Sequence, residues 1–179
     1  MRLLAFAASN SSKSINRQLA RYAASLVEGA VEGVQIDDLD IHDFEMPIYR
    51  SDREEESGIP QLAHDFLARI GQADAIIISF AEHNGNYTAA FKNLFDWCSR
   101  LGRDVWQSKP MILLSTSPGG RGGKSVLEIA SAAAPRFGGE VIGTLSVPSF
   151  GESFDAGAGK LIDEELDAQL RALVTKLDA

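Results

Sequence analysis

The sequence predicts an α/β protein in which helices cover both faces of a parallel β-sheet. Two kinds of segment support this prediction. Short apolar runs end in polar turns, as is typical of buried strands, and longer segments repeat their apolar residues every three or four positions, as is typical of helices. The two kinds alternate along the chain, and such alternation indicates a parallel sheet. At 179 residues, the chain is expected to form one domain, residues 1–179.

Five strands are expected from the apolar and alternating runs. They cover residues 3–8, 34–39, 73–80, 110–116 and 140–147. Residues 73–80 form the most apolar run, so this strand is expected at the centre of the sheet. Because crossovers between parallel strands are right-handed, few topologies remain. A flavodoxin-like three-layer sandwich with strand order 2-1-3-4-5 is favoured.

Five helices are expected from the helical spacing of apolar residues. They cover residues 15–27, 60–70, 88–101, 126–134 and 161–177. Ser14 or Asn16 is expected to cap the first of them. Residues 40–58 and 150–159 are expected to be irregular. The charge run Asp52–Glu56 is typical of a solvated loop face.

Charge and composition exclude several classes of function. The formal net charge of -8 argues against non-specific nucleic-acid binding and against attraction to an anionic membrane surface. The apolar run at residues 3–8 is too short to span a membrane and is interpreted as the first core strand. One cysteine, Cys98, allows no intrachain disulfide and suits a reducing cytoplasm. One cysteine and three scattered histidines provide no zinc-type metal site.

The predicted strand order brings the loops after the first, third and fourth strands to one edge of the sheet, where open α/β sheets bind ligands. The first loop places Ser9, Ser11, Ser14 and Asn16 directly before or at the start of a helix. Hydroxyl and amide groups at a helix N-terminus are suited to a phosphate. The alternative is an ordinary cluster of capping residues. The loop contains neither a dinucleotide fingerprint nor a P-loop motif.

The second loop follows the most apolar strand and contains Glu82, His83, Asn84 and Gly85. Asparagine side chains and glycine N–H groups suit the hydrogen-bonding edge of a flat heterocycle. The alternative is a turn between strand and helix with no ligand. His83 is either a proton donor beside such a ligand or a turn residue, and the sequence leaves both open.

The third loop contains Ser117, Gly119 and Gly120. Because glycine has no side chain, the backbone N–H groups of this loop are able to approach a ligand closely. The alternative is a flexible connection between the fourth strand and the next helix.

The stretch from Ala81 to Trp97 resembles the signature P-E-[YH]-N-G-[ST]-[YIP]-x-x-x-[LF]-K-N-x-[IF]-D-W of the NADPH-dependent FMN reductase family, which includes quinone, chromate and azo-dye reductases. The matching residues are Glu82, Asn84, Gly85, Tyr87, Lys92, Asn93, Asp96 and Trp97. The first loop is similar to the family pattern G-S-x-R-x-x-S-x-N at Ser9, Ser14 and Asn16, and the third resembles its Ser/Gly-rich loop.

The resemblance implies where the cofactor binds. The FMN phosphate is expected on Ser9, Ser11, Ser14, Ile15 and Asn16. The flavin ring is expected against Glu82, His83, Asn84 and Gly85. The pyrimidine edge is expected on Ser117, Gly119 and Gly120. The cofactor carries the chemistry, so no catalytic side chain is assigned.

The resemblance also implies an activity. We expect an FMN-dependent NAD(P)H oxidoreductase that passes electrons from NADPH or NADH through FMN to a flavin, quinone, azo dye or metal-oxyanion acceptor in a ping-pong scheme. In this family the helix after the second loop packs across a dimer interface, so a homodimer or homotetramer is expected.

Four departures from the family pattern leave alternatives open, and two of them, Ala81 for a proline and His83 for the usual tyrosine, lie in or next to the second loop. Ala8 replaces a glycine, and Ser11 replaces an arginine that pairs with the phosphate in two parallel hydrogen bonds. Lys13 is the residue of this loop that could partly replace the missing charge. One alternative is therefore a relative that no longer holds flavin tightly. The other is a flavodoxin-like electron carrier, whose acidic surface would dock on basic partners. Cys98 is expected in the core, with a reactive thiol as the alternative.

Overall fold

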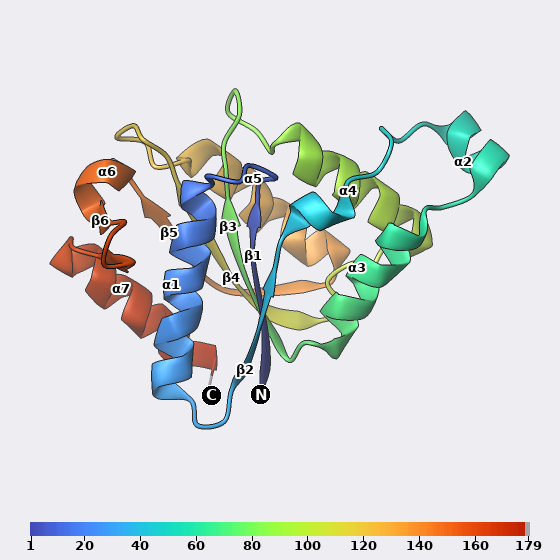
Figure 1. The fold of residues 1–179 in the computed structure, drawn as a ribbon. Helices are drawn as coiled ribbons and strands as arrows, with labels where there is room; N and C mark the ends of the chain where they lie inside the picture. Colours follow the sequence, from blue (N-terminus) through green and yellow to red (C-terminus); the bar gives the residue numbers. More distant parts are fainter. Residues whose placement is uncertain (178–179) are drawn as a thin grey trace.

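The computed structural model describes residues 1–177 and contains one five-stranded parallel sheet with the order β2-β1-β3-β4-β5 (Figure 1). The strands are β1 (Arg2–Ala8), β2 (Gln35–Leu39), β3 (Ala75–Phe80), β4 (Lys109–Thr116) and β5 (Gly139–Val147). The predicted strand order is confirmed. Every residue of β3 is buried, in agreement with its predicted central place.

Helices cover both faces of this sheet (Figure 1). They are α1 (Ile15–Ala30), α3 (Gln61–Gln72), α4 (Ala89–Leu101), α5 (Lys124–Ala133) and α7 (Glu164–Val174). Helices α1 and α7 share one hydrophobic core, and α3, α4 and α5 share the other. In β1, Leu4 and Phe6 enter the second of these cores while Leu3 and Ala5 enter the first, because side chains alternate along a strand. No helix among residues 1–177 is long and apolar enough to cross a membrane.

The two segments predicted to be irregular contain short elements, and that prediction is corrected. Residues 40–58 hold a 3₁₀ helix, η1 (Ile41–Phe44), and the exposed helix α2 (Ser51–Ser57). Helix α2 has no buried residue, so the sequence offers no apolar stripe to reveal it. Glu54 fastens it by accepting hydrogen bonds from the hydroxyl of Tyr49 and the guanidinium of Arg100.

The chain after β5 also differs from the prediction. It forms a short helix, α6 (Phe150–Ser153), and a two-stranded ribbon of β6 (Phe154–Asp155) and β7 (Lys160–Leu161). Leu161 therefore lies in β7, not in the last helix. Helix α7 begins later because the Asp163 carboxylate accepts hydrogen bonds from two N–H groups of its first turn. Two further 3₁₀ helices are η2 (Ala134–Phe137) and η3 (Thr175–Leu177).

Two hydroxyl caps begin the helices that follow β1 and β3. The Ser14 hydroxyl accepts a hydrogen bond from the N–H of Arg17 at 3.2 Å and begins α1, as the sequence predicts. The Thr88 hydroxyl accepts from the N–H of Phe91 and begins α4. Thr88 also donates to the carbonyl of Ala8 at 3.0 Å, so the start of α4 is fixed to the end of β1.

Candidate functional site

The loops after β1, β3 and β4 enclose a cavity of about 290 Å³, which we call the polar pocket. Its lining residues are Ser9, Ser11, Lys13, Ser14, Ile15, Asn16, Ala81, Glu82, His83, Thr116, Ser117 and Pro118. Eight of the twelve residues predicted for cofactor binding lie in this lining. Its volume is at the lower end of the range for ligand pockets. The three loops therefore meet as the sheet order predicts.

The N-terminus of α1 presents free hydrogen-bond donors to the polar pocket. Within residues 1–177, the N–H groups of Ile15 and Asn16 have no acceptor. The loop before them is ordered by its own hydroxyls, because Ser9 accepts from the N–H of Ser11 and Ser11 accepts from the N–H of Lys13, both at 3.3 Å. Free N–H groups and the positive end of the helix dipole make this a site for an anion.

Asn16 has a structural role that the sequence does not reveal. Its side chain donates to the carbonyl of Thr116 at 3.1 Å and accepts from the Ser79 hydroxyl at 2.7 Å and the N–H of Thr116 at 3.0 Å. The residue is 2% exposed. The side-chain amide thus fastens α1 to β3 and β4, and the backbone N–H is the group that Asn16 can offer to a ligand.

Glu82 links the second loop to α5. Its carboxylate accepts a hydrogen bond from the N–H of Val126 at 2.9 Å. The residue before α5 is Gly123, which has no side chain to cap the helix. Glu82 therefore supplies this cap from a different loop, and its charge is held beside the positive end of the α5 dipole.

The residues after Glu82 form a tight two-residue turn that rises above the sheet edge (Figure 1). His83 and Asn86 exchange two backbone hydrogen bonds, of 3.0 and 3.1 Å. The two residues between them have left-handed backbones, with φ of 54° at Asn84 and 75° at Gly85. Positive φ at both positions defines a type I′ turn, for which Asn-Gly is the preferred pair. Asn84 and Gly85 thus lie at the tip, outside the lining of the polar pocket.

The glycine-rich loop after β4 divides into two halves. A side chain at Gly122 would lie 2.5 Å from the Ser146 hydroxyl, and its φ is 58°, so the fold requires glycine there. At Gly119 and Gly120 a side chain would meet nothing within 4 Å, and φ is not positive. The N–H groups of these two residues have no acceptor within residues 1–177. They lie outside the pocket lining but offer free donors beside Ser117.

Sequence reasoning missed Thr116 and named Lys13 only as a compensating charge, although both line the polar pocket. Among the residues that the structure describes, Lys13 is the only lysine or arginine in this lining. Thr116 is the last residue of β4, so the rule that ligands bind at the C-terminal strand ends would have found it. Hydroxyls, free N–H groups and one lysine fit a phosphate-bearing group, and the donors at the Asn84 turn fit a neutral ring edge.

The second half of the signature stretch has a structural role. Asn93 accepts from the N–H of Tyr49 at 2.8 Å and donates to the carbonyls of Met46 and Pro47. The Trp97 indole also donates to the carbonyl of Pro47, at 2.7 Å. These bonds fix the segment between η1 and α2 against α4. The match at these positions thus reports on the fold more than on a ligand.

Cys98 lies away from the polar pocket. The residue is fully buried, and burial raises the pKa of its thiol to about 12. A thiol that stays protonated at neutral pH is a poor nucleophile. The core role that the sequence favours is therefore the one the structure supports.

Comparison with known proteins places the chain in a family. A sequence model of NADPH-dependent FMN reductases matches residues 1–150. The NADPH:quinone oxidoreductase of Arabidopsis thaliana is 31% identical over 188 residues, covering 100% of this chain and 91% of that protein. The quinone reductase of Escherichia coli K12 is 31% identical over 123 residues, covering 63% of this chain and 65% of that protein.

Solved structures agree with the fold. FerB, a flavoenzyme NAD(P)H:(acceptor) oxidoreductase from Paracoccus denitrificans, superposes with a TM-score of 0.75 at 24% identity, covering 99% of this chain and 97% of that one. An FMN-dependent NADH-azoreductase from Bacillus anthracis, solved with FMN, superposes with a TM-score of 0.67 at 12% identity, covering 100% of both chains. The extent of the family match and the identity to the plant enzyme carry the conclusion that the chain belongs to the NADPH-dependent FMN reductase family, a family of oxidoreductases.

Proposed function

We propose that this chain binds FMN in the polar pocket and uses NADPH or NADH to reduce a small-molecule acceptor. The observation that carries the proposal is the pair of free N–H groups of Ile15 and Asn16 at the start of α1, inside a pocket of hydroxyls. Ser9, Ser11 and Ser14 add hydroxyl donors for the phosphate, and Lys13 contributes the positive charge that the family arginine would otherwise supply.

The flavin ring is proposed to lie against the turn at Asn84 and the loop at Gly119 and Gly120. When bound, FMN supplies the transfer of electrons between the nicotinamide and the acceptor. Free backbone N–H groups of Gly85, Gly119 and Gly120 would stabilise negative charge on the ring, as oxyanion-hole donors do. The Glu82 carboxylate accepts a hydrogen bond from the N–H of Val126, so the positive end of the α5 dipole offsets part of its charge.

Quinones are the acceptor class we propose, because the relatives that match over most of the chain are named as NADPH:quinone oxidoreductases. Flavins, azo dyes and metal oxyanions are further acceptor classes of the family. We propose that nicotinamide and acceptor use the same face of the ring in turn, which gives ping-pong kinetics. We also propose that residues 1–179 act as one FMN-binding domain, that the protein is cytoplasmic, and that it assembles as a homodimer or homotetramer.

Reconstitution with FMN tests the proposal. The purified protein with FMN is expected to oxidise NADPH or NADH in the presence of a quinone, with initial rates that give parallel double-reciprocal lines. Riboflavin, which lacks the phosphate, is the matched control and should bind about tenfold or more weaker than FMN, because charge-assisted hydrogen bonds are lost.

Two results would contradict the proposal. Failure to oxidise either nucleotide with any acceptor, while FMN binds, would favour a flavodoxin-like electron carrier. An FMN dissociation constant far above cellular flavin concentrations would instead indicate a relative that no longer holds the cofactor, consistent with Ser11 at the family's arginine position.

A further inference from the structure

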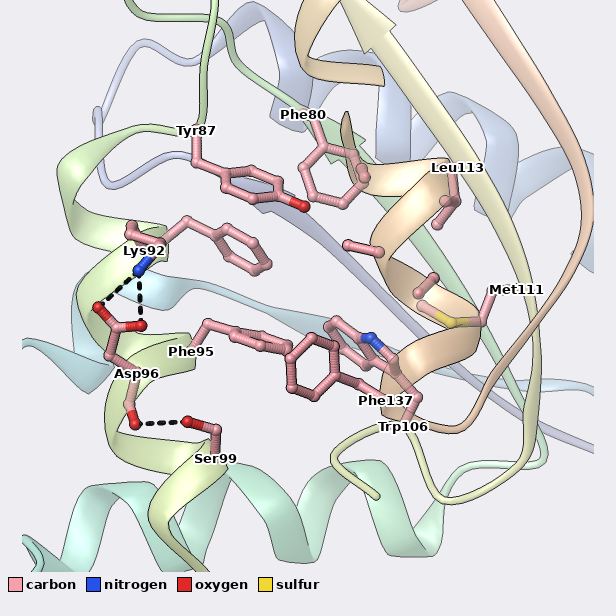
Figure 2. A pocket seen from close by; sticks show the side chains of 14 residues that line it. Phe80, Tyr87, Lys92, Phe95, Asp96, Ser99, Trp106, Met111, Leu113 and Phe137 are labelled. Atoms are coloured by element: carbon pink, nitrogen blue, oxygen red, sulfur yellow. Dashed lines mark hydrogen bonds and ion pairs between the residues drawn. The ribbon is translucent and has the colours of Figure 1, made fainter. Parts of the chain in front are cut away.

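A second cavity, of about 250 Å³, lies between α4 and α5 on the sheet face opposite α1 (Figure 2). We call it the aromatic cavity. Its walls are formed mainly by the rings of Phe80, Tyr87, Phe91, Phe95, Trp106 and Phe137. Within the described part of the chain, no residue lines both this cavity and the polar pocket. The aromatic cavity is therefore a separate space, and the family's cofactor site does not account for it.

The charged groups at the aromatic cavity are already paired with each other. Both carboxylate oxygens of Asp96 accept hydrogen bonds from the Lys92 ammonium, at 2.7 and 2.8 Å. The Ser99 hydroxyl donates to the carbonyl of Asp96 at 2.8 Å. Figure 2 shows these contacts along α4, at the side of the ring of aromatic side chains. A charged ligand would find no free counter-charge here.

Two hydrogen-bond donors in the walls have no partner. Within residues 1–177, neither the Tyr87 hydroxyl nor the Trp106 indole N–H makes a hydrogen bond. Figure 2 shows Tyr87 at one end of the cavity and Trp106 at the other. Burial raises the pKa of Tyr87 to about 12, so at neutral pH its hydroxyl is a protonated donor. Neither atom is a fully buried polar atom without a partner, so both keep some exposure, and a molecule in the cavity that these residues line would be able to reach them.

The size of the cavity limits the occupant. An apolar protein cavity of about 150 Å³ holds benzene, so this one has room for a substituted or fused ring. Aromatic walls favour a flat molecule through offset and edge-to-face contacts. We propose that the aromatic cavity binds an uncharged, flat aromatic molecule that carries carbonyl oxygens, which accept hydrogen bonds from Tyr87 and Trp106.

The proposal concerns binding and assigns no electron transfer to this cavity, so it does not rest on the proposed function. A side chain from a second copy of this chain is the competing occupant. Although Tyr87, Phe95 and Phe137 are half-buried, the inner walls disfavour such an occupant, because Phe80, Phe91 and Trp106 are only 2%, 2% and 3% exposed in the single chain. A surface already buried to this degree leaves little area for an interface between copies.

Equilibrium dialysis of the FMN-loaded protein tests the proposal with 1,4-diacetylbenzene, a para-dicarbonyl that NADPH does not reduce. We expect one molecule bound per chain, with or without FMN. The matched probe 1,4-diethylbenzene lacks the carbonyls and should bind about tenfold weaker, because two neutral hydrogen bonds are lost. The dianion terephthalate should not bind.

Variants separate this cavity from other sites. Tyr87→Phe should weaken the binding of 1,4-diacetylbenzene about fivefold and leave the binding of 1,4-diethylbenzene unchanged. The control is Tyr49→Phe, because the Tyr49 hydroxyl bonds to Glu54, and it should change the affinity for neither probe. Ala133→Phe places a ring into the cavity from a half-buried wall position and should abolish binding of both probes. Circular dichroism checks that each variant is folded.

Several outcomes would overturn the proposal. Loss of the probe on adding FMN would put it in the polar pocket. No binding at millimolar probe, or equal binding by the wild type and a folded Ala133→Phe protein, would mean that the cavity holds only water. Conversion of an oligomer to monomers by Ala133→Phe, with no probe bound to the wild type, would make this face a contact between copies.

Discussion

The polar pocket and the aromatic cavity both adjoin the C-terminal end of β3, yet they are built in opposite ways. Phe80 lines the aromatic cavity, and the next residue, Ala81, lines the polar pocket. The polar pocket consists mainly of loop residues, with the first residues of α1, the last residue of β4 and free backbone N–H groups. The aromatic cavity consists of side chains from helix faces that also form the core. A substitution in the polar pocket is therefore expected to affect mainly ligand binding. A substitution in the aromatic cavity is expected to affect mainly stability.

The largest effect is expected at the wall of the aromatic cavity. Phe91 is 2% exposed and packs against the rings of Phe80, Tyr87 and Phe95, with centroids 5.2 to 6.1 Å away. Phe91→Ala should lower the free energy of unfolding by about 3–5 kcal/mol. In the polar pocket, Ser11→Ala should change it by less than about 0.5 kcal/mol. Urea denaturation of both variants measures the difference, and equal stabilities would contradict this contrast.

Asn16 differs from its neighbours in the polar pocket, because it supports the fold. Asn16→Ala removes three buried hydrogen bonds and leaves the Ser79 hydroxyl and the Thr116 backbone without partners. The free energy of unfolding should fall by about 2–3 kcal/mol. Asn10→Ala, at an exposed position of the same loop, is the control and should change little. A fully stable Asn16→Ala protein would show that the network contributes nothing to folding.

Within the glycine-rich loop after β4, one glycine is required by the fold and another is proposed to contact the ligand. Gly122→Ala forces a side chain against Ser146 and the backbone at a positive φ, and should destabilise the protein by about 2 kcal/mol. Gly120→Ala meets nothing within 4 Å, so stability should be unchanged to within about 0.5 kcal/mol. The proposed approach of flavin to this loop predicts that Gly120→Ala lowers FMN affinity several-fold, which flavin fluorescence measures. Unchanged affinity would place the ring elsewhere.

The two regions also differ in how far the sequence predicts them. The polar pocket follows from strand order and from residue types that suit a ligand, so the sequence alone predicts Ser9, Ser14, Glu82 and Ser117. The partners of Asn16 were not predictable, because Thr116 is 100 residues away and only the folded sheet brings it close. Asn84 and Gly85 form the turn their sequence prefers, yet nothing in that preference says that they lie outside the pocket lining.

No pattern in the sequence predicts the aromatic cavity. Phe91 and Phe95 are four residues apart on α4, which predicts a buried helix face whether or not space remains beside it. Trp106 lies between elements and reaches this face only through the tertiary fold. The order of strands and helices follows from local pattern, whereas a gap in packing depends on the shapes of side chains that are distant in sequence.

A smaller effect is expected from the charge of the polar pocket. If Lys13 compensates for the arginine that Ser11 replaces, Lys13→Ala should weaken FMN about threefold to fivefold at low salt. Screening should reduce the difference as salt is raised. Riboflavin affinity should not change, because it has no phosphate. Lys160→Ala, in β7 and away from the pocket, is the control. An equal loss of FMN affinity in that variant would mean that Lys13 acts only through the overall charge of the protein.

The smallest effect is a pH dependence that belongs to the aromatic cavity. An unfolded tyrosine releases its proton near pH 10, but burial raises the pKa of Tyr87 to about 12 in the folded protein. Between these values the folded state binds more protons than the unfolded state, so stability should fall as pH rises from about 10 to about 12. Below pH 10 both states keep the proton, and this group adds no slope. Tyr87→Phe should make the decline shallower, while Tyr22, Tyr49 and Cys98 still contribute theirs.

Urea denaturation of the wild type and of Tyr87→Phe at pH 9, 10 and 11 measures the contribution of Tyr87 to stability. The other groups that lose protons in this range, Tyr22, Tyr49 and Cys98, are present in both proteins. A difference that grows with pH would mean that the cavity wall resists charge, as an apolar site for neutral molecules must. Identical slopes would mean that water reaches the phenol freely and stabilises its anion. The aromatic cavity would then be a wet cleft like the polar pocket, and the contrast between the two regions would lie only in their side chains.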